Sequence, residues 1–395
     1  MRKKKIAIIG LGIGGLNLAY GLAKEELFDI TIFTNKSAED IQEGRIPSTQ
    51  VHFEKMLKRE KLYSMPEYGE VNELKKVELK LNGQKLFKGN LHNRAISIDQ
   101  RIYLPTLMNG LENLNVDIVH RRVNKENLTS LGSQFDLIID SSGKNGPIAS
   151  FEPYEWIKKP YSPLRICSAG FFYGLDSDEE NKLSFNILPG QGELFEMSIV
   201  TKNGLARSLL LEAVPGGKLD IIKGDRGAED FADKMKNVLS EFFPEIYKRV
   251  HPEKFRLIDD MAYTRMAIKP ELRIPYTMIN QTLVIGCGDS VFLNDPITGQ
   301  GANTTSYCAE ELRKILVDNA RESWGISLGI QYWDRIKQYV VQVSEWTNAM
   351  MGPLSSSFLD FINDATKSQE VADEFVNMFH DPQKAYNVFF GTYVH

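Results

Sequence analysis

Cysteine is scarce in this sequence. The 395 residues include three cysteines, Cys167, Cys287 and Cys308. They are too few and too widely spaced for a disulfide framework or a zinc knuckle. We therefore expect no metal site, and a reducing cytoplasm is the simplest location for the protein.

Long apolar runs and net positive charge are also lacking. The sequence has no stretch of 18 or more apolar residues that would form a membrane span. The formal net charge is -5 and the isoelectric point is near 5.8, so there is no basic field for nucleic acid. The sequence therefore predicts neither a membrane nor a nucleic-acid partner.

The composition that is present, 42% hydrophobic and 25% charged, is that of an ordinary globular protein. At 395 residues the chain exceeds the length at which a single hydrophobic core keeps growing. We therefore expect two domains.

A glycine motif stands near the N-terminus. The basic first residues and the apolar run behind them could pass for a signal peptide. However, Lys5–Ile9 has the composition of a buried parallel strand, and Leu16–Ala23 has a helical pattern. Between them, Gly10, Gly12 and Gly15 provide a tight turn, room for a pyrophosphate and close helix packing, in that order. In this strand-turn-helix setting the motif predicts a dinucleotide site.

The next strand, Asp29–Phe33, ends without the acidic residue that commonly binds an adenosine ribose. Thr34 and Asn35 stand there instead. Their side chains can hydrogen-bond a ribose hydroxyl, so we assign them to the cofactor site. Alternatively they only begin a loop. The pattern leaves the choice between FAD and NAD open.

A polar loop, Ser37–Thr49, follows this strand. From this position its side chains could reach the ring end of a cofactor. We assign the hydroxyl pair of this loop, Ser48 and Thr49, to the active site on that ground. The alternative is an ordinary surface loop.

Arg101 lies in a segment that leads into an expected helix, Thr106–Leu114. A guanidinium near the start of a helix can pair with a cofactor diphosphate through two parallel hydrogen bonds. The alternative is a surface ion pair with Asp99.

Residues 164–215 differ in style from the N-terminal region. Short β-rich runs alternate there with turn residues, and residues 70–90 alternate charged and apolar positions. Both patterns indicate antiparallel sheet, which we assign to a second domain. Its aromatic residues either wall an apolar cavity or form ordinary core; they are Phe171, Tyr173, Phe185 and Phe195.

The segment from Gly286 to Asn303 joins a short apolar strand to a helical pattern. Asp289 can accept hydrogen bonds from sugar or ribityl hydroxyls. Gly299 and Gly301 let the backbone pass close under a flat ring, and Pro296 stiffens the approach. The helix start beyond them favours an anion. The alternative is that these residues merely form turns.

These features together resemble the oxygenase component of styrene and indole monooxygenases. The matching segments run nearly from end to end and are GLGIGGLNLAYGLA from Gly10, Arg101-Ile-Tyr-x-Pro-x-Leu-Met108, Asp136-Leu-Ile-Ile with Gly143-Lys144, Pro189-Gly-x-Gly-Glu-Leu194, Gly288-Asp289 with Asp295-Pro-x-x-Gly-Gln-Gly-Ala-Asn303, and Ala372-Asp-Glu-Phe375. The segment ending at Asn303 is shared with the wider aromatic hydroxylases. The Pro-Gly-x-Gly-Glu-Leu turn and the tail point to this subgroup.

The resemblance implies a mixed α/β fold like that of 4-hydroxybenzoate hydroxylase. It would comprise a Rossmann-like FAD-binding domain, an inserted antiparallel β-sheet domain for the substrate, and a C-terminal helical tail. The expected ranges are 1–50, 92–163 and 260–320 for the FAD-binding domain, 51–91 and 164–259 for the substrate domain, and 321–395 for the tail.

The resemblance also implies site residues. Gln300 would join Arg45, Ser48 and Thr49 at the reacting end, although Ser48 stands where the subgroup is expected to have Asn. The residues implied to hold FAD are Gly10, Gly12, Gly15, Arg101, Asp289, Pro296, Gly299, Gln300, Gly301, Ala302 and Asn303.

The implied enzyme receives reduced FAD from a separate NAD(P)H:flavin reductase. Reduced FAD would add O2 at C4a, and the hydroperoxide would pass one oxygen to the double bond of a styrene- or indole-like substrate. The chemistry belongs to the cofactor, while the protein excludes water and holds the alkene over the ring. A homodimer is a further expectation.

Two other classes stay open. A self-sufficient NAD(P)H-dependent aromatic hydroxylase would use the same cradle, but the Asp-Gly pair that serves flavin and NADPH together in those enzymes is replaced here by Ser142-Gly143. A non-catalytic escort protein of the same fold would not need an intact segment at 286–303. Flavin halogenases are disfavoured because the sequence has no Trp-x-Trp-x-Ile-Pro motif.

Overall fold

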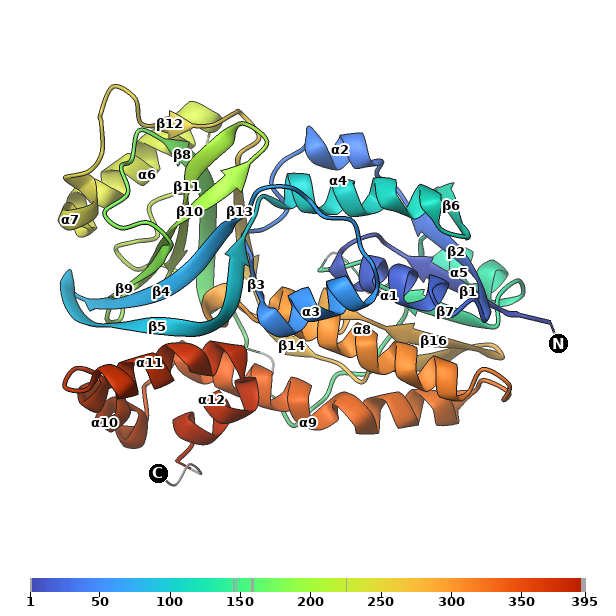
Figure 1. The fold of residues 1–395 in the computed structure, drawn as a ribbon. Coiled ribbons are helices and arrows are strands. Elements are labelled where there is room, and N and C mark those ends of the chain that lie inside the picture. Colours follow the sequence, from blue (N-terminus) through green and yellow to red (C-terminus); the bar gives the residue numbers. More distant parts are fainter. Residues whose placement is uncertain (1, 145, 147, 158–159, 225, 392–395) are drawn as a thin grey trace.

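The computed structural model describes residues 2–144, 146, 148–157, 160–224 and 226–391. Two large sheets lie side by side, and a layer of C-terminal helices runs along one side of both (Figure 1). Within these described ranges, no helix combines the length and apolar character needed to cross a membrane.

The first sheet has six strands in the order β15-β16-β7-β1-β2-β6. Neighbouring strands pair in parallel, except that β15 adds antiparallel to β16 at one edge. Ile6 and Ile8 are fully buried, as expected for a parallel sheet that is covered on both faces. The strands are β1 (Lys4–Ile9), β2 (Phe28–Thr34), β6 (Val116–His120), β7 (Leu137–Asp140), β15 (Tyr276–Ile279) and β16 (Thr282–Gly286).

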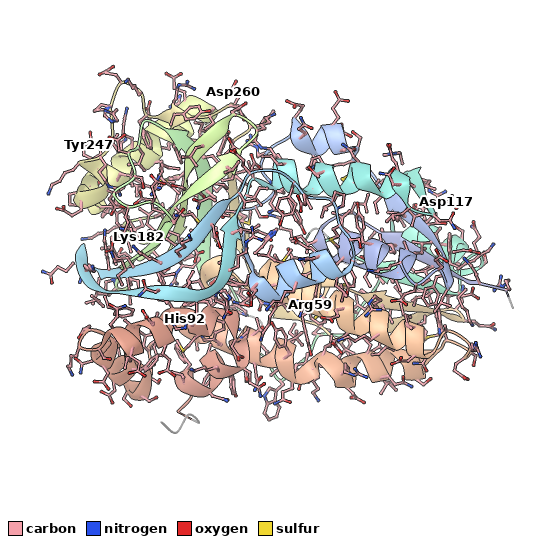
Figure 2. The ribbon with its side chains drawn as sticks, viewed as in Figure 1. Arg59, His92, Asp117, Lys182, Tyr247 and Asp260 are labelled. Atoms are coloured by element: carbon pink, nitrogen blue, oxygen red, sulfur yellow. The ribbon has the colours of Figure 1, made fainter. Side chains whose placement is uncertain are left out.

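Helices and short turns surround this sheet (Figure 1). Helix α1 packs against α8. Arg59 of α3, which is labelled in Figure 2, forms an ion pair with Glu310 of α8. The elements are α1 (Ile13–Ala23), α2 (Ala38–Gln42), α3 (Glu54–Leu62), α4 (Gln100–Gly110), η1 (Leu111–Asn113), α5 (Lys125–Gly132), η2 (Gly288–Ser290), η3 (Pro296–Thr298), α8 (Gly301–Asp318), and the two-stranded pair β14 (Glu271–Leu272) and β17 (Phe292–Leu293).

The second sheet has nine strands in the order β12-β8-β11-β10-β9-β4-β5-β3, and β13 pairs with β8 beside β12. Pairing is antiparallel except between β4 and β9. On one face, Phe231 of α6 stacks near Phe172 of β8. The elements are β3 (Val51–Phe53), β4 (Asn72–Leu81), β5 (Gln84–Ser97), β8 (Arg165–Tyr173), β9 (Lys182–Leu188), β10 (Gly192–Thr201), β11 (Gly204–Ala213), α6 (Ala228–Phe242), α7 (Pro244–Tyr247), β12 (Arg256–Leu257) and β13 (Tyr263–Ile268).

The C-terminal helices fasten the two halves together. The long helix α9 lies against α8, and α11 lies against β5 (Figure 1). The Phe375 ring meets Phe87 edge-on at 5.0 Å, and the Asp373 carboxylate accepts from the Asn90 amide at 2.7 Å. The elements are α9 (Ile326–Met350), α10 (Ser356–Ala365), α11 (Gln369–Asn377), η4 (Met378–His380) and α12 (Pro382–Phe389).

The mixed α/β class is confirmed, with the start of one helix corrected, while the domain division stays a prediction. The helix expected at 106–114 begins at Gln100, because the Asp99 side chain accepts from the Arg101 amide and caps it. The boundaries expected at residues 92 and 260 do not follow the sheets. Strand β5 continues to Ser97, and β13, beyond residue 260, pairs with β8 of the nine-stranded sheet.

Gly15 and Gly12 provide a stability test of the N-terminal turn. A Cβ at Gly15 would overlap the Gly10 carbonyl oxygen, whereas a Cβ at Gly12 would meet no described atom within 4 Å. We expect Gly15→Ala to lower the free energy of unfolding by about 1–3 kcal/mol or more, and Gly12→Ala to change it far less. Urea denaturation of both variants measures this, and equal losses would contradict the packing described.

Candidate functional site

A cavity of about 420 Å³ lies where the two sheets meet, and residues from both line it. This volume is within the range of small-molecule sites. The first sheet contributes Gly12, Ser141 to Lys144, and Cys287 to Asp289, which follow the ends of β1, β7 and β16. These are the carboxyl ends of neighbouring parallel strands, the usual ligand position in such sheets.

The N-terminal turn fits a phosphate group. Gly10 has φ +98 and donates its amide to the Phe33 carbonyl at 2.8 Å, which fixes the turn between β1 and α1 against β2. Gly12 lines the cavity at the N-cap of α1, where no side chain of the described residues caps the helix. The first amides of α1 and the positive end of its dipole are therefore available to an anion. Gly10 and Gly15 do not line the cavity; they shape the turn.

The segment from Asp295 to Asn303, called here the cofactor loop, leads into α8. Like α1, this helix begins without a side-chain cap from the described residues. The Asp295 side chain accepts from the Ile297 amide at 3.1 Å, and Gly299 adopts φ +64, a left-handed conformation that suits glycine. Gly301 begins α8, and among the described residues no side chain caps it. Pro296, Gly299, Gly301 and Ala302 line the cavity.

Asn303 braces the cofactor loop from behind. Its Oδ1 accepts from the Phe53 amide at 2.9 Å, and its Nδ2 donates to the carbonyls of Val51 and Gly299, each at 2.9 Å. The side chain is thus occupied by protein groups. Its position indicates that it holds the loop rather than contacting a ligand in the main cavity.

The Gln300 amide also faces away from the main cavity. It donates to the carbonyls of Thr298 and Phe379, at 3.1 and 2.9 Å. Gln300 lines a separate pocket of about 190 Å³ with Tyr307 and His380. The expected catalytic position of the Gln300 side chain is therefore not the one seen in this structure.

The three candidate residues of the 37–49 loop lie in two different places. Ser48 and Thr49 line the main cavity, and Ser48 Oγ accepts from Gln50 Nε2 at 2.8 Å. Arg45 lies outside it, with its guanidinium 4.0 Å from the Tyr263 ring centroid, in a neighbouring pocket that Arg265 also lines. The structure thus brings Ser48 and Thr49, but not Arg45, to the cavity.

Thr34 and Asn35 are at the end of β2 but not in the lining of the main cavity. Thr34 Oγ1 donates to the Lys36 carbonyl at 3.0 Å and accepts from the Lys36 amide at 3.2 Å. This is the loop-starting arrangement that the sequence left as the alternative. Their role in binding an adenosine ribose stays a prediction.

Arg101 is buried in two ion pairs. Its guanidinium donates to Asp99 at 2.9 and 3.0 Å and to both oxygens of Asp259 at 3.0 Å. The pair with Asp99 was the alternative considered from the sequence, but it is buried rather than on the surface. Binding of a diphosphate by Arg101 stays a prediction and requires the displacement of a carboxylate.

Two charged side chains in the cavity were not assigned from the sequence as a functional pair. Lys144 and Asp289 both line it, and burial lowers the pKa of Lys144 and raises the pKa of Asp289, each shift being opposed by the charge of the other. The Asp289 side chain is exposed because it faces the cavity, although protein surrounds the cavity at this point. Only the recurrence of Gly143-Lys144 in the family pattern pointed to the lysine.

Part of the cavity lining is apolar. The rings of Phe185 and Phe195 stack there with centroids 4.4 Å apart, near Met197 and Phe379. The other two aromatic candidates lie elsewhere. Phe171 is fully buried in the core beneath the nine-stranded sheet, and Tyr173 donates its hydroxyl to the Asn203 carbonyl at 2.6 Å.

Comparison with known proteins identifies relatives of this chain. Residues 143–249 match the family model of the styrene monooxygenase A substrate-binding domain. Styrene monooxygenase StyA from Pseudomonas fluorescens is 28% identical, and the match covers 98% of this chain and 95% of that protein. StyA from a Pseudomonas species gives the same identity and coverage.

Solved structures share the fold. The flavin-dependent brominase Bmp2 has a TM-score of 0.71 at 11% identity, covering 98% of this chain and 97% of that one. P. aeruginosa PqsL in complex with 2-aminobenzoylacetate has a TM-score of 0.65 at 14% identity, covering 94% and 100%. At these identities the likeness establishes the fold alone.

The open space at Gly12 yields a binding test. We expect Gly12→Val to weaken FAD binding at least about 100-fold, or ~2.7 kcal/mol, because the branched side chain would occupy the space of the pyrophosphate, while the fold stays intact. Gly325→Val is the matched control, since Gly325 is also an N-cap with open space but lies outside the cavity lining. Fluorescence titration with FAD and thermal unfolding measure both; parent-like binding by Gly12→Val would mean that the cradle is misassigned.

Proposed function

We propose, from the premise that this chain is a homologue of the styrene monooxygenases and an FAD-dependent monooxygenase, that it epoxidises the double bond of styrene- or indole-like substrates with reduced FAD and O2. The observation that carries the proposal is one continuous cavity whose lining has a polar part and an apolar part. Uncapped helix starts and Asp289 form the polar part of its lining, and the Phe185–Phe195 pair belongs to the apolar part.

The residues present fit FAD. The first amides of α1 would hold the diphosphate, and Asp289 would accept hydrogen bonds from the ribityl hydroxyls. The start of α8 would stabilise negative charge on the reduced ring. Gly12 and Gly301 leave open space for these contacts, since a Cβ at either position would meet no described atom within 4 Å.

Bound reduced FAD supplies the oxygen chemistry: one atom of O2 goes to the substrate and the other leaves as water. The protein provides positioning and dryness. The stacked Phe185 and Phe195, with Leu183 and Met197, form an apolar wall that can orient an aromatic alkene and exclude water. Ser48 and Thr49 would lie near the reacting end, as polar groups beside that wall.

The reduced flavin is proposed to come from a separate NAD(P)H:flavin reductase. The single GxGxxG motif and Ser142-Gly143, in place of the hydroxylases' Asp-Gly pair, support this. The comparisons do not favour a single-component hydroxylase. Free, buried cysteines agree with the proposed cytoplasmic location; a homodimer stays a prediction.

Product analysis tests the proposed function directly. We expect the protein, mixed with chemically reduced FAD, O2 and a panel of styrenes and indoles, to form epoxides or their rearrangement products. Hydroxylated rings without epoxide would contradict the assignment of the reaction.

A second test concerns the electron source. Because the chain is proposed to lack a nicotinamide site, the purified protein should not reduce FAD with NADH or NADPH. Absorbance at the NADPH band, followed with and without substrate, measures this. Steady, substrate-accelerated NADPH oxidation by the isolated chain would favour the single-component hydroxylase.

The start of α8 gives a third test. Gly301→Leu should push the cofactor loop off the ring and weaken binding of reduced FAD by up to about tenfold or somewhat more, since dipole effects are worth about 0.3–2 kcal/mol. Oxidised FAD should bind nearly as it binds the parent, and hydrogen peroxide should rise at the expense of epoxide. Anaerobic titration of both redox forms measures this, and an equal loss for both would place the ring elsewhere.

A further inference from the structure

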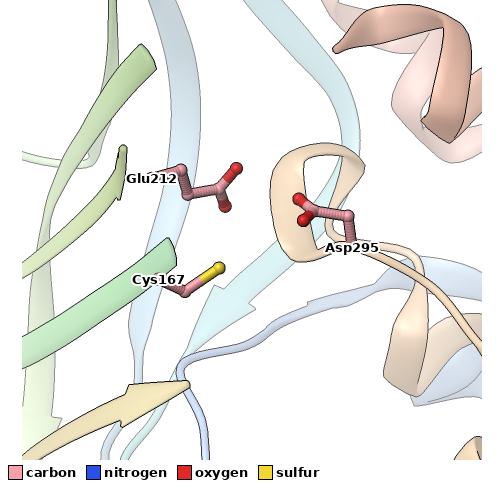
Figure 3. Close-up of side chains that lie close together, drawn as sticks. All are labelled: Cys167, Glu212 and Asp295. Atoms are coloured by element: carbon pink, nitrogen blue, oxygen red, sulfur yellow. The ribbon is translucent and has the colours of Figure 1, made fainter. Parts of the chain in front are cut away.

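A row of three side chains, Cys167, Glu212 and Glu193, crosses the neighbouring strands β8, β11 and β10 beside the cavity. In the strand register, Glu212 of β11 stands opposite Cys167 of β8 on one side and opposite Glu193 of β10 on the other. Directly opposite residues on adjacent strands share a face. Figure 3 shows Glu212 and Cys167 pointing toward Asp295 of the cofactor loop.

The positive charge next to this row, on Arg165, is already paired with Glu193. Arg165, two residues before Cys167, donates to both oxygens of Glu193, at 2.7 and 2.8 Å. Glu212 is 0% exposed, and neither of its carboxyl oxygens has a hydrogen-bond partner among the described residues. A buried carboxylate left without a partner is strongly unfavourable, so Glu212 requires a proton or a ligand.

Asp295 faces Glu212, and one of its two carboxylate oxygens has no hydrogen-bond partner among the described residues. Its Oδ1 accepts from the Ile297 amide, while Oδ2 has no partner in the described part of the chain. Asp295 is 1% exposed, and ligand atoms of Asp295, Glu212 and Cys167 all lie within 4.8 Å of one another. Two ionised carboxylates at this separation would repel each other in a dry environment.

We propose that Glu212 and Asp295 share one proton, held by Glu212 and donated to Asp295, and that this O–H···O hydrogen bond ties the cofactor loop to the substrate-binding sheet. Asp295 then uses one oxygen to cap the turn at Pro296–Thr298 and the other to hold β11. Glu212 is a positioning residue in this arrangement, because it acts on the loop through Asp295.

The surrounding charges agree with one shared proton. Burial raises the pKa of Glu212 well above its usual range, and Asp295 and Glu193 raise it further, while Arg165 opposes them. Burial raises the pKa of Asp295 to about 6, against the lowering effects of Ile297, Glu212 and Arg165.

The thiol beside the pair stays protonated. Burial raises the pKa of the Cys167 thiol well above its ordinary value. The negative charges of Glu212 and Asp295 raise this pKa further, and the positive charges of Arg165 and Lys144 lower it by less. A sulfur and two carboxylates are also a ligand set for zinc or cobalt. Binding of a metal ion by Cys167, Glu212 and Asp295 is therefore the alternative to a shared proton, and it would overturn the proposal.

The first test needs no flavin. At about pH 6 the infrared spectrum of the protein should contain the carbonyl stretch of a protonated carboxylic acid, and subtracting the Glu212→Gln spectrum should isolate it. Subtraction is required because burial raises the pKa of Glu60 to about 7, which gives a second such band. If parent and variant have the same acid bands, Glu212 is not protonated and the proposal fails.

Glu196→Gln is the matched control. Glu196 is equally buried on β10 but paired with Arg207 and Arg249, and these partners hold its pKa below the ordinary value despite burial. Its removal should therefore leave the acid band unchanged. Glu212→Gln and Glu196→Gln are the same chemical substitution. They differ in that the Glu212 carboxyl is proposed to carry a proton and the Glu196 carboxylate is not.

The second test measures the tie to the cofactor loop and rests on the proposed function, because it requires FAD to bind there. As pH rises above the pKa of the pair, the proton is lost, and the dissociation constant of FAD should rise by up to about tenfold per pH unit. Glu212→Gln and Asp295→Asn should flatten this rise, since an amide can donate at every pH. A pH dependence unchanged in both variants would refute the tie, whereas absence of FAD binding at any pH, with the infrared band present, would refute only the proposed function.

The third test is titration of the parent with Co2+, whose thiolate complexes absorb strongly. We expect no cobalt-thiolate band and no change in the infrared acid band. A stoichiometric band that Cys167→Ser abolishes would show that the cluster is a metal site and would overturn the shared proton.

Discussion

The carboxamide of Asn303 is the interaction on which the geometry of the cavity depends. Its three hydrogen bonds join β3 of the nine-stranded sheet, the cofactor loop at Gly299 and the first turn of α8. Because the side chain is buried, each of these bonds is protected from competition by water. These bonds hold β3 of the nine-stranded sheet against the cofactor loop and the start of α8, which line the cavity, so this part of the lining is formed without a ligand to assemble it.

Glycine positions show how much of the site could be predicted. The spacing of Gly10, Gly12 and Gly15 identified the turn, its strand and its helix, because that motif encodes local backbone geometry. The Gly286–Asn303 segment was recognisable for the same reason. The mixed α/β class was implied by the family resemblance, and the antiparallel second sheet followed from its turns.

Side-chain direction could not be predicted in the same way. Gln300 lies within a recognisable motif, yet its amide faces Phe379, a residue 79 positions away. Arg45 stacks on Tyr263 and Arg101 pairs with Asp259, which are both distant in sequence. The importance of Glu212 depends on strand register and on Arg165 being committed elsewhere, and a single sequence shows neither. Long-range partners therefore account for most of the difference between the expected and observed site.

The ion pairs of Arg101 have a consequence for how long a flavin can reside on the protein. Asp99 is fully buried with the guanidinium, whereas the Asp259 side chain is 25% exposed and is the partner that a phosphate could replace. Replacing one charge-assisted pair by another offsets much of the free energy gained. If Arg101 binds the diphosphate as predicted, the flavin would exchange readily with the surrounding solution, which would suit the proposed uptake of reduced FAD from a separate reductase.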